Sequence, residues 1–455
     1  MNQKNKTGTM RIRDMTTGEP IKQILLFAVP LFIGNIFQQI YNLVDTSVVG
    51  HCIGDNAISA IGATSSLCML LISVLISLNS GYAIIIAQSF GAHDESKLKT
   101  CIAGTFLLNF GTIVLFTLLS ASFLKPLMRF MNTPDSIFKD AYDYMFVICI
   151  GLFTTVCYNM FAAILRAIGN SRTPLYCLII SSVANVVLDL LFVAVFNMGV
   201  VGAAIATVLA QLISAALCGL AFFLNYPRYV PRRKEFQISK RVMPTLLSTG
   251  CSMALMMCVV HMGTLIFQRA NNALGEACIT AYAAGRRIVS IVMQPFGTIA
   301  DANATFVSQN WGAKQYNRIK TTLRKVMLIE ICWGFVACVL MFGLGDSIIR
   351  IVTGTENAQI IADAVLCMRA NGPFLPILGI LLCLRTAMQA MGYKRDPVIS
   401  SCVELAMKMA GAILVIPSIG FIGSCFTEPV TWVFMTIYLV VAYFLRRKNI
   451  FKETI

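Results

Sequence analysis

Two aspartates stand inside long apolar stretches of this 455-residue chain, where an ionised side chain is costly. Asp45 lies near the end of the stretch 23–49, and Asp189 lies past the middle of the stretch 174–196. A carboxylate in an apolar span usually faces a water-filled cavity or a charged partner. Carboxyl oxygens in such a place can bind a hard cation such as sodium or hold a proton between them. The alternative is a carboxylate that reaches water at the end of its span.

Amide and hydroxyl side chains accompany both aspartates at helical spacing. Steps of three, four and three residues place one set on a single helical face, and this set is Asn35, Gln38, Asn42 and Asp45. A second set at similar steps is Ser182, Asn185 and Asp189. We therefore expect each aspartate on a polar stripe of an otherwise apolar helix, both at similar depth.

The second half of the chain carries different candidates. Gln294 and Asp301 keep helical spacing in the stretch 278–309, where they could line a cavity or contact another helix. His261 lies in the preceding stretch and is a third candidate for this cavity. Glu404 and Lys408 stand four residues apart, a spacing that predicts an ion pair of structural rather than substrate-binding role.

A proline interrupts the stretch that carries Asp45. Pro30 is followed one turn later by Gly34. Proline inside a helix frees a carbonyl and permits a kink. Whether such a kink is static or changes during a working cycle stays open at this point.

The apolar stretches predict an integral membrane protein. Hydrophobic residues make up 57% of the chain and charged residues 13%, whereas soluble domains carry about 25% charged residues. A membrane-spanning helix needs about 20 apolar residues. Twelve stretches meet this length, at 23–49, 58–88, 99–124, 138–163, 174–196, 199–224, 242–270, 278–309, 322–345, 358–388, 397–417 and 421–445.

An internal repeat divides these stretches into two sets of six. QSFGA at Gln88 recurs as QNWGA at Gln309, and Gly169, Arg172 and Pro174 recur as Gly392, Arg395 and Pro397. Duplicated halves in a membrane protein are typical of secondary transporters. Because six is even, the halves should run parallel. We predict an N-terminal segment 1–22, a first lobe 23–224, a linker 225–240, a second lobe 241–446 and a tail 447–455.

The net charge of +15 predicts orientation rather than a nucleic-acid partner. Most Lys and Arg residues fall at the two ends, in the 225–240 linker and in every second loop. Because basic loops usually lie on the cytoplasmic side, this pattern predicts a cell-membrane protein with both termini in the cytoplasm. A nucleic-acid interface would need one continuous basic surface. The polar start is not typical of a signal peptide, and the 16 cysteines, without a CxxC pair, predict neither disulfides nor a metal cluster.

The phrases EPIKQILLFAVPLFIGNIFQQIYNLVDTSVVG, AQSFGA, LRAIGNSRTP and NVVLDLLF resemble segments of the multidrug and toxic compound extrusion (MATE) family, of its DinF-like and archaeal-like branch. The resemblance covers about residues 18–447. It implies an all-α membrane fold of the MOP superfamily, with two pseudo-symmetric six-helix bundles. It also implies alternating access and efflux of organic, often cationic, compounds in exchange for sodium or protons, with no other cofactor.

The same resemblance implies a set of functional residues. Asp45 and Asp189 match the family's paired acids, the only place where we expect a metal ion, sodium. Asn185 and Thr207 match the amide and hydroxyl that complete the site, and Gln38 matches a polar neighbour. In relatives the first helix bends near a proline placed like Pro30. The chain lacks the acid that some members carry beside His261, so a second-lobe cation site does not carry over.

Other functions stay in view. A lipid-linked oligosaccharide flippase of the same superfamily is the nearest alternative, although the acidic and neutral stripes favour cationic cargo. A membrane-embedded transferase would need paired acidic motifs or a histidine at a loop mouth, and the chain has neither a DxxxD pair in a loop nor an HxxxxD motif. We therefore expect a transporter rather than an enzyme, acting as a monomer on small organic molecules.

Overall fold

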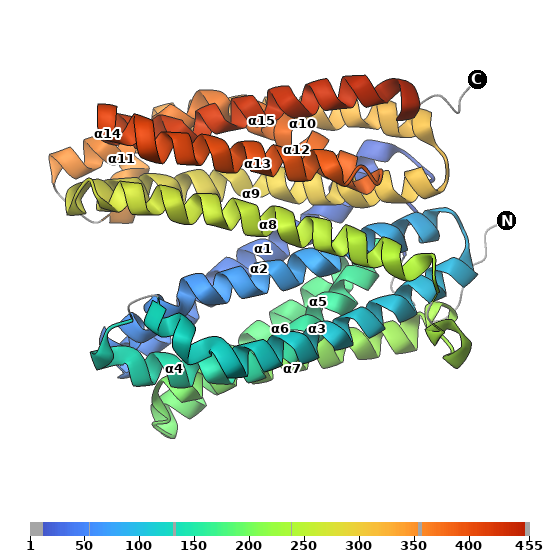
Figure 1. The fold of residues 1–455 in the computed structure, drawn as a ribbon, viewed down its shortest axis with the longest axis horizontal. Helices are drawn as coiled ribbons and strands as arrows, with labels where there is room; N and C mark the ends of the chain where they lie inside the picture. The colour runs from blue at the N-terminus through green and yellow to red at the C-terminus, as the bar shows by residue number, and fades with distance from the viewer. Residues whose placement is uncertain (1–11, 54, 131–132, 238, 354–356, 451–455) are drawn as a thin grey trace. The chain divides into compact units, whose positions relative to one another are not determined.

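The structure is a computed structural model that describes residues 12–53, 55–130, 133–237, 239–353 and 357–450, most of them helical (Figure 1). No strand occurs within these ranges. The helices of the first half are α1 (Pro20–Ile53), α2 (Asp55–Gly91), α3 (Glu95–Phe130), α4 (Asp135–Ile150), α5 (Leu152–Ala167), α6 (Arg172–Asp189) and α7 (Gly199–Asn225). Those of the second half are α8 (Val242–Asn272), α9 (Glu276–Gly312), α10 (Tyr316–Thr353), α11 (Ala358–Asn371), α12 (Leu375–Ala390), α13 (Arg395–Ala410), α14 (Ile416–Ile419) and α15 (Phe421–Ile450).

Breaks in the helices repeat between the halves. α4 and α5 form one rod that bends by 44° at Gly151. At the offset that relates QSFGA to QNWGA, Gly151 matches Gly372, which opens a 3-10 turn, Gly372–Phe374, between α11 and α12. A Cβ atom at Gly151 would lie 2.2 Å from a methyl group of Val208, so only glycine fits this bend against α7.

A second irregularity also occurs in both halves. α6 ends at Asp189 and passes directly into a π-helix, Leu190–Val195. α13 passes into a π-helix at the matching place, Gly411–Val415. Wide turns of this kind inside α-helices are frequent at functional sites. The one in the first half therefore directs attention to Asp189.

The helices have the length and apolarity of membrane spans. Within the described residues, ten helices are long and apolar enough to cross a membrane, and the bent α4–α5 pair makes an eleventh. Of the twelve predicted apolar stretches, 278–309 is the one whose helix does not reach this apolarity. It forms the continuous helix α9, but Arg286, Arg287 and Asp301 lower its hydropathy.

By its internal contacts the chain divides into two units, which differ from the predicted lobes at their edges. The first comprises residues up to Asp14 and Val29–Cys251, and the second comprises Met15–Ala28 and Ser252–Ile455. Helices α1 and α8 therefore each change unit within their length. The boundary falls at Cys251 in α8 rather than in the predicted linker 225–240.

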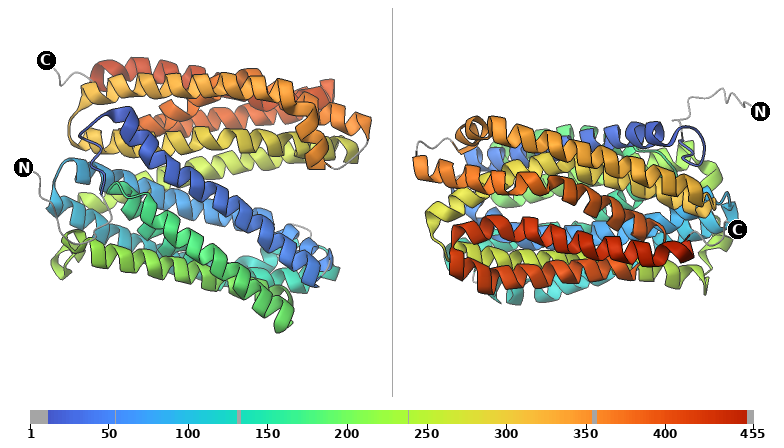
Figure 2. Two further views of the ribbon diagram at one scale, coloured as in Figure 1. Left: turned by 180° about the vertical axis from the view of Figure 1, so that it is seen from behind. Right: turned by 90° about the horizontal axis from the view of Figure 1, so that it is seen from above.

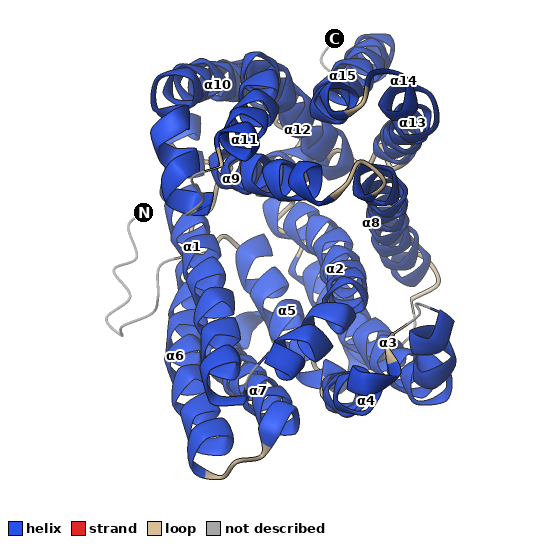
Figure 3. Ribbon diagram, turned by 90° about the vertical axis from the view of Figure 1, so that its left-hand side faces the viewer, coloured by secondary structure: helices blue, strands red, loops and turns tan. Residues whose placement is uncertain are grey.

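In the first unit, α7 packs against α4, α5 and α6, and α6 runs beside α7 in Figure 3. Small residues of α7 such as Ala203 and Ala204 permit this close approach. The start of α8 packs on α2, where a Cβ atom at Gly81 would lie 2.6 Å from the Cα of Gly250. The part of the predicted linker at Arg233–Phe236 packs against α3, with Phe236 stacked on Phe106.

In the second unit, α12 packs against α9, α10 and α15, and α13 runs beside α15 (Figure 2). The segment before α1 is anchored here by the repeated phrase at Gln309. The Gln309 side chain accepts a hydrogen bond from the Met15 N–H at 2.9 Å. The Arg318 guanidinium donates to the carbonyls of Thr17 at 3.1 Å and Gly18 at 2.7 Å. Part of the predicted N-terminal segment 1–22 thus packs against the second half of the chain.

Candidate functional site

Asp189 is the last residue of α6 and is fully buried in the first unit. Neither of its carboxyl oxygens accepts a hydrogen bond from any group in the described residues. Buried polar atoms in folded proteins are nearly always bonded, because an unpaired one costs free energy. Asp189 therefore needs a partner that the chain's own donors do not supply.

Asp45 on α1 lies beside Asp189. Its carboxyl group lies within hydrogen-bonding range of the carboxyl group of Asp189. The Oδ1 atom of Asp45 is also buried and accepts no hydrogen bond. Two ionised carboxylates have no donor to share, so this contact requires a proton or a cation between them. The structure thus brings together the two aspartates that the sequence singled out.

Asn185 stands one turn before Asp189 on the same face of α6. It is fully buried, and neither its amide oxygen nor its amide nitrogen has a hydrogen-bond partner in the described residues. Its oxygen, with those of Asp45 and Asp189, makes a small group of buried acceptors. Oxygen ligands of this type are those that hard cations prefer.

Tyr41 and Thr207 complete this group. Thr207 of α7 donates its hydroxyl hydrogen to the carbonyl of Ala203 at 3.0 Å and shares a hydrogen bond with the Tyr41 hydroxyl. Tyr41 lies close enough to Asp45 and Asp189 to interact with both charges. The sequence interpretation missed Tyr41, although its place one turn before Asp45 is a usable signal.

Gln38 lies apart from the group. It stands two helical turns before Asp45, and its side chain is exposed. The side chain of Asn42, between them on the same stripe, lies outside the described residues. No contact in the described part of the chain joins Gln38 to either aspartate, so its predicted role as a polar neighbour remains a prediction.

Pro30 lies where α1 changes unit, two residues after Ala28. It is buried, and α1 continues through it as one helix. Because Pro30 has no N–H group, the carbonyl of Leu26 has no helical donor and this turn is easier to bend. The proline thus lies at the point in α1 where the internal contacts change from those of the second unit to those of the first.

We expect Pro30→Ala to restore the missing helical hydrogen bond and to stiffen α1. If bending of α1 belongs to the working cycle, transport should fall several-fold at normal membrane abundance. Pro126→Ala in α3 is the matched control, since it removes another proline from a helix interior and should leave transport unchanged. Undiminished transport by the Pro30 variant would make the proline structural only.

The three candidates of the second unit differ in their surroundings. Gln294 is half-buried, and its carbonyl accepts a hydrogen bond from the Thr298 hydroxyl at 2.9 Å. Asp301 is exposed. His261 lies near the charges of Glu404 and Lys408. A shared cavity lining by Gln294, Asp301 and His261 stays a prediction.

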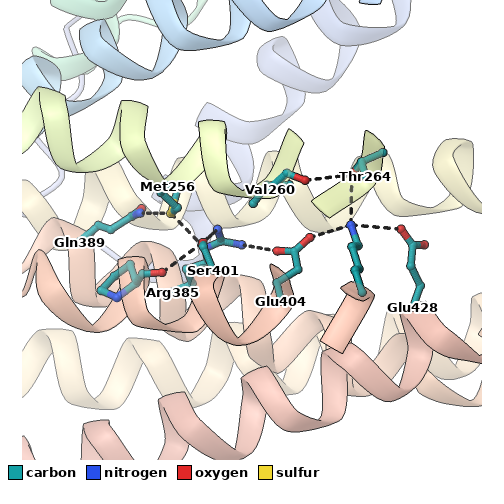
Figure 4. Close-up of polar contacts among 10 residues, drawn as sticks. Met256, Val260, Thr264, Arg385, Gln389, Ser401, Glu404 and Glu428 are labelled. Atoms are coloured by element: carbon teal, nitrogen blue, oxygen red, sulfur yellow. Dashed lines mark hydrogen bonds and ion pairs between the residues drawn. The ribbon is translucent and has the colours of Figure 1, made fainter. Parts of the chain in front are cut away.

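The predicted contact between Glu404 and Lys408 is confirmed, at 2.9 Å, and it belongs to a longer series of buried and half-buried charges (Figure 4). Lys408 also lies 3.7 Å from Glu428 of α15, which pairs with Arg286 of α9. Glu404 lies 3.9 Å from Arg385 of α12. We call these five residues the charge ladder: Arg286, Glu428, Lys408, Glu404 and Arg385.

The sequence interpretation missed three members of the charge ladder. Arg286, Arg385 and Glu428 each stand inside a helix of membrane-span length, which was the available signal. Their pairing could not be read from spacing, because they come from α9, α12 and α15. The charge ladder therefore joins four helices of the second unit through buried and half-buried ion pairs.

Comparison with known proteins agrees with this architecture. The MatE family model matches residues 30–191 and 252–429. A probable multidrug resistance protein of Bacillus subtilis, YpnP, is 28% identical over 84% of this chain and 85% of its own length. A Shewanella oneidensis protein named as an FAD transporter is 23% identical over 69% of this chain and 70% of its own.

Solved structures share the fold. A multidrug resistance MATE family transporter of the MOP superfamily, solved in an outward-facing conformation, superposes with a TM-score of 0.88. It is 21% identical, and the match covers 98% of this chain and 99% of that one. A MATE structure described as the bent conformation gives a TM-score of 0.87 at 21% identity, covering 96% of each chain.

Proposed function

The chain belongs to the MatE family of membrane transporters, and we propose that it is a secondary active multidrug antiporter. It would export organic, often cationic, compounds in exchange for sodium ions or protons. The observation that carries this proposal is the buried pair of Asp45 and Asp189, whose carboxyl groups need a proton or cation between them. The relatives named as multidrug resistance or export proteins support the efflux role.

The carboxyl pair suggests how the ion gradient is used. A proton or sodium ion that enters from outside would offset one of the two negative charges of Asp45 and Asp189 and so reduce their repulsion and allow them to stay in contact. Loss of the ion would restore their repulsion and favour another arrangement of α1 and α6. A ligand drives such a change only through its different affinity for the two states. Asn185 and Thr207 would add oxygen ligands to the ion, and no other cofactor is proposed.

We further propose that the protein acts as a monomer in the cell membrane with both termini cytoplasmic. The basic residues of 225–240 support this orientation. Cysteine placed at Lys234, which is exposed, should resist a membrane-impermeant thiol reagent added to intact cells that lack other reactive cysteines. Cysteine at Asn132, outside the described residues, should react. The reverse labelling pattern would refute the orientation.

The proposal is tested with purified protein in liposomes under an imposed sodium gradient and, separately, an imposed pH gradient. A panel of organic cations and dyes supplies the cargo. We expect one of the two gradients to drive cargo movement against its concentration, and its collapse to stop it. Movement that neither gradient accelerates would contradict the proposed antiport.

A further inference from the structure

At the Arg385 end of the charge ladder, strong hydrogen-bond donors are paired with a weak acceptor. The Nε of Arg385 donates to the sulfur of Met256 at 3.2 Å, and the amide nitrogen of Gln389 donates to the same sulfur at 3.0 Å (Figure 4). A thioether is a weak acceptor. Two buried donors, one of them charged, thus share one sulfur atom.

The remaining contacts of Arg385 leave its charge poorly compensated. Its Nη2 donates to the Ser401 hydroxyl at 2.5 Å, and its nearest carboxylate, Glu404, lies 3.9 Å away. Glu404 holds Lys408 more closely, at 2.9 Å. Arginine normally forms two parallel hydrogen bonds with a carboxylate or phosphate. Arg385 therefore has the capacity for an oxyanion that its own neighbours do not use.

The charge ladder as a whole also has an excess of positive charge. It contains three cations, Arg286, Arg385 and Lys408, against two carboxylates, Glu404 and Glu428, which leaves one positive charge in excess. A buried charge without a counter-ion is strongly destabilising. An anion at the Arg385 end would bring the group to neutrality.

The internal repeat shows that this arrangement is particular to the second unit. At the offsets that relate the repeated phrases, Lys408 matches Asn185 and Glu428 matches Thr207. The place of the proposed cation site in the first unit thus holds the protein's own ammonium group in the second. Arg385 matches an alanine of α5, so the donor has no counterpart in the first unit. A metal cation at this matching place in the second unit would be repelled by the Lys408 ammonium group, whereas an anion would not be repelled.

Met256 can act as a removable cover for these donors. Methionine is unbranched, so its side chain can rotate away without a change in the backbone of α8. Arg385, Gln389, Ser401 and Met256 are all buried, so the donors become accessible only when the thioether moves.

From these observations we propose that Arg385, Gln389 and Ser401 form a binding site for the oxyanion group, carboxylate or phosphate, of an organic ligand, and that Met256 covers it. The role of this site toward cargo rests on the proposed transport function. It adds to that function by identifying a chemical group, an oxyanion, that the cargo carries. Binding itself needs no ion gradient, so it can be tested when transport is not measured.

The test compares flavin mononucleotide with riboflavin, which lacks only the phosphate. Binding to the full chain in phosphatidylcholine nanodiscs is followed by fluorescence anisotropy. We expect the phosphate to tighten binding about ten-fold, as a charge-assisted hydrogen bond does. Arg385→Gln should abolish this preference, whereas Arg350→Gln, which removes an exposed cation of α10, should preserve it. Equal binding of the two flavins, or a preference that survives in the Arg385 variant, would overturn the proposal.

Two further variants keep the test valid if Arg385→Gln does not fold. Gln389→Leu should reduce the phosphate preference, and Met256→Ala, which keeps every donor, should retain or increase it. A preference unchanged by Gln389→Leu and lost with Met256→Ala would contradict the site. Nanodiscs that contain phosphatidylglycerol distinguish the source of the oxyanion: competition with flavin mononucleotide that depends on Arg385 would identify a lipid headgroup as the ligand.

Discussion

Asp189→Asn protein is expected to reach the membrane at normal abundance and to lose gradient-driven efflux. Asparagine keeps the shape of the side chain but cannot bind and release a proton, and it lacks the negative charge that holds a cation. Asp45→Asn should have the same effect, because the two carboxyl groups lie within hydrogen-bonding range and, in the proposed mechanism, act on one ion. Efflux from liposomes under the driving gradient is the measurement, and we expect it to fall to the level of protein-free liposomes.

Controls for this prediction come from the same site and from the second unit. Asn185→Ala and Thr207→Ala remove neutral ligands and should weaken efflux less than the aspartate changes. Asp346→Asn alters an exposed acid of α10 and should leave efflux intact. If both aspartate variants pump at the wild-type rate, the coupling site lies elsewhere and Asp301 becomes the next candidate.

The second large effect is expected from Glu404→Gln, as a loss of stability rather than of specific activity. The change leaves Lys408 with Glu428 at 3.7 Å and leaves Arg385 without its nearest carboxylate. Removal of one partner of a buried ion pair costs about 3–5 kcal/mol. We therefore expect a lower thermal midpoint in detergent and lower membrane abundance, while the molecules that remain folded still transport.

A double variant separates charge imbalance from local damage. Glu404→Gln combined with Lys408→Met restores the original excess of one positive charge, so its thermal midpoint should exceed that of Glu404→Gln. Asp346→Asn is the matched control, because it breaks an exposed pair with Arg369 at 2.8 Å. Exposed pairs contribute about 0–1 kcal/mol. A Glu404 variant as stable as the Asp346 variant would show that the charge ladder does not stabilise the fold.

Composition and repetition by themselves predict the membrane class and the paired halves. Apolar length alone placed the helical stretches, because a bilayer allows a helix only if about 20 residues avoid charge. The apolar signal is weaker at α9, where polar residues within the helix keep it below the apolarity of its neighbours. The repeated glycines at 151 and 372 could also have been aligned in the sequence.

Local spacing was sufficient where both partners lie on one helix. Glu404 and Lys408 contact one another because residues four apart share a helical face. Asn185 and Asp189 share their face of α6 for the same reason. Spacing alone did not identify Tyr41 as a member of the site. It placed Gln38 on the polar stripe of α1 but did not show that the side chain of Gln38 is exposed.

Only the tertiary structure decided which charges meet across helices. Arg286, Arg385 and Glu428 belong to α9, α12 and α15, and their contacts depend on how each helix is rotated and packed against the others. The assignment of residues 15–28 to the second unit likewise depends on Gln309 and Arg318, which lie far away in the sequence. Sequence periodicity identifies the polar face of a helix, but the neighbour of that face is set by packing between helices, which periodicity within one helix does not encode.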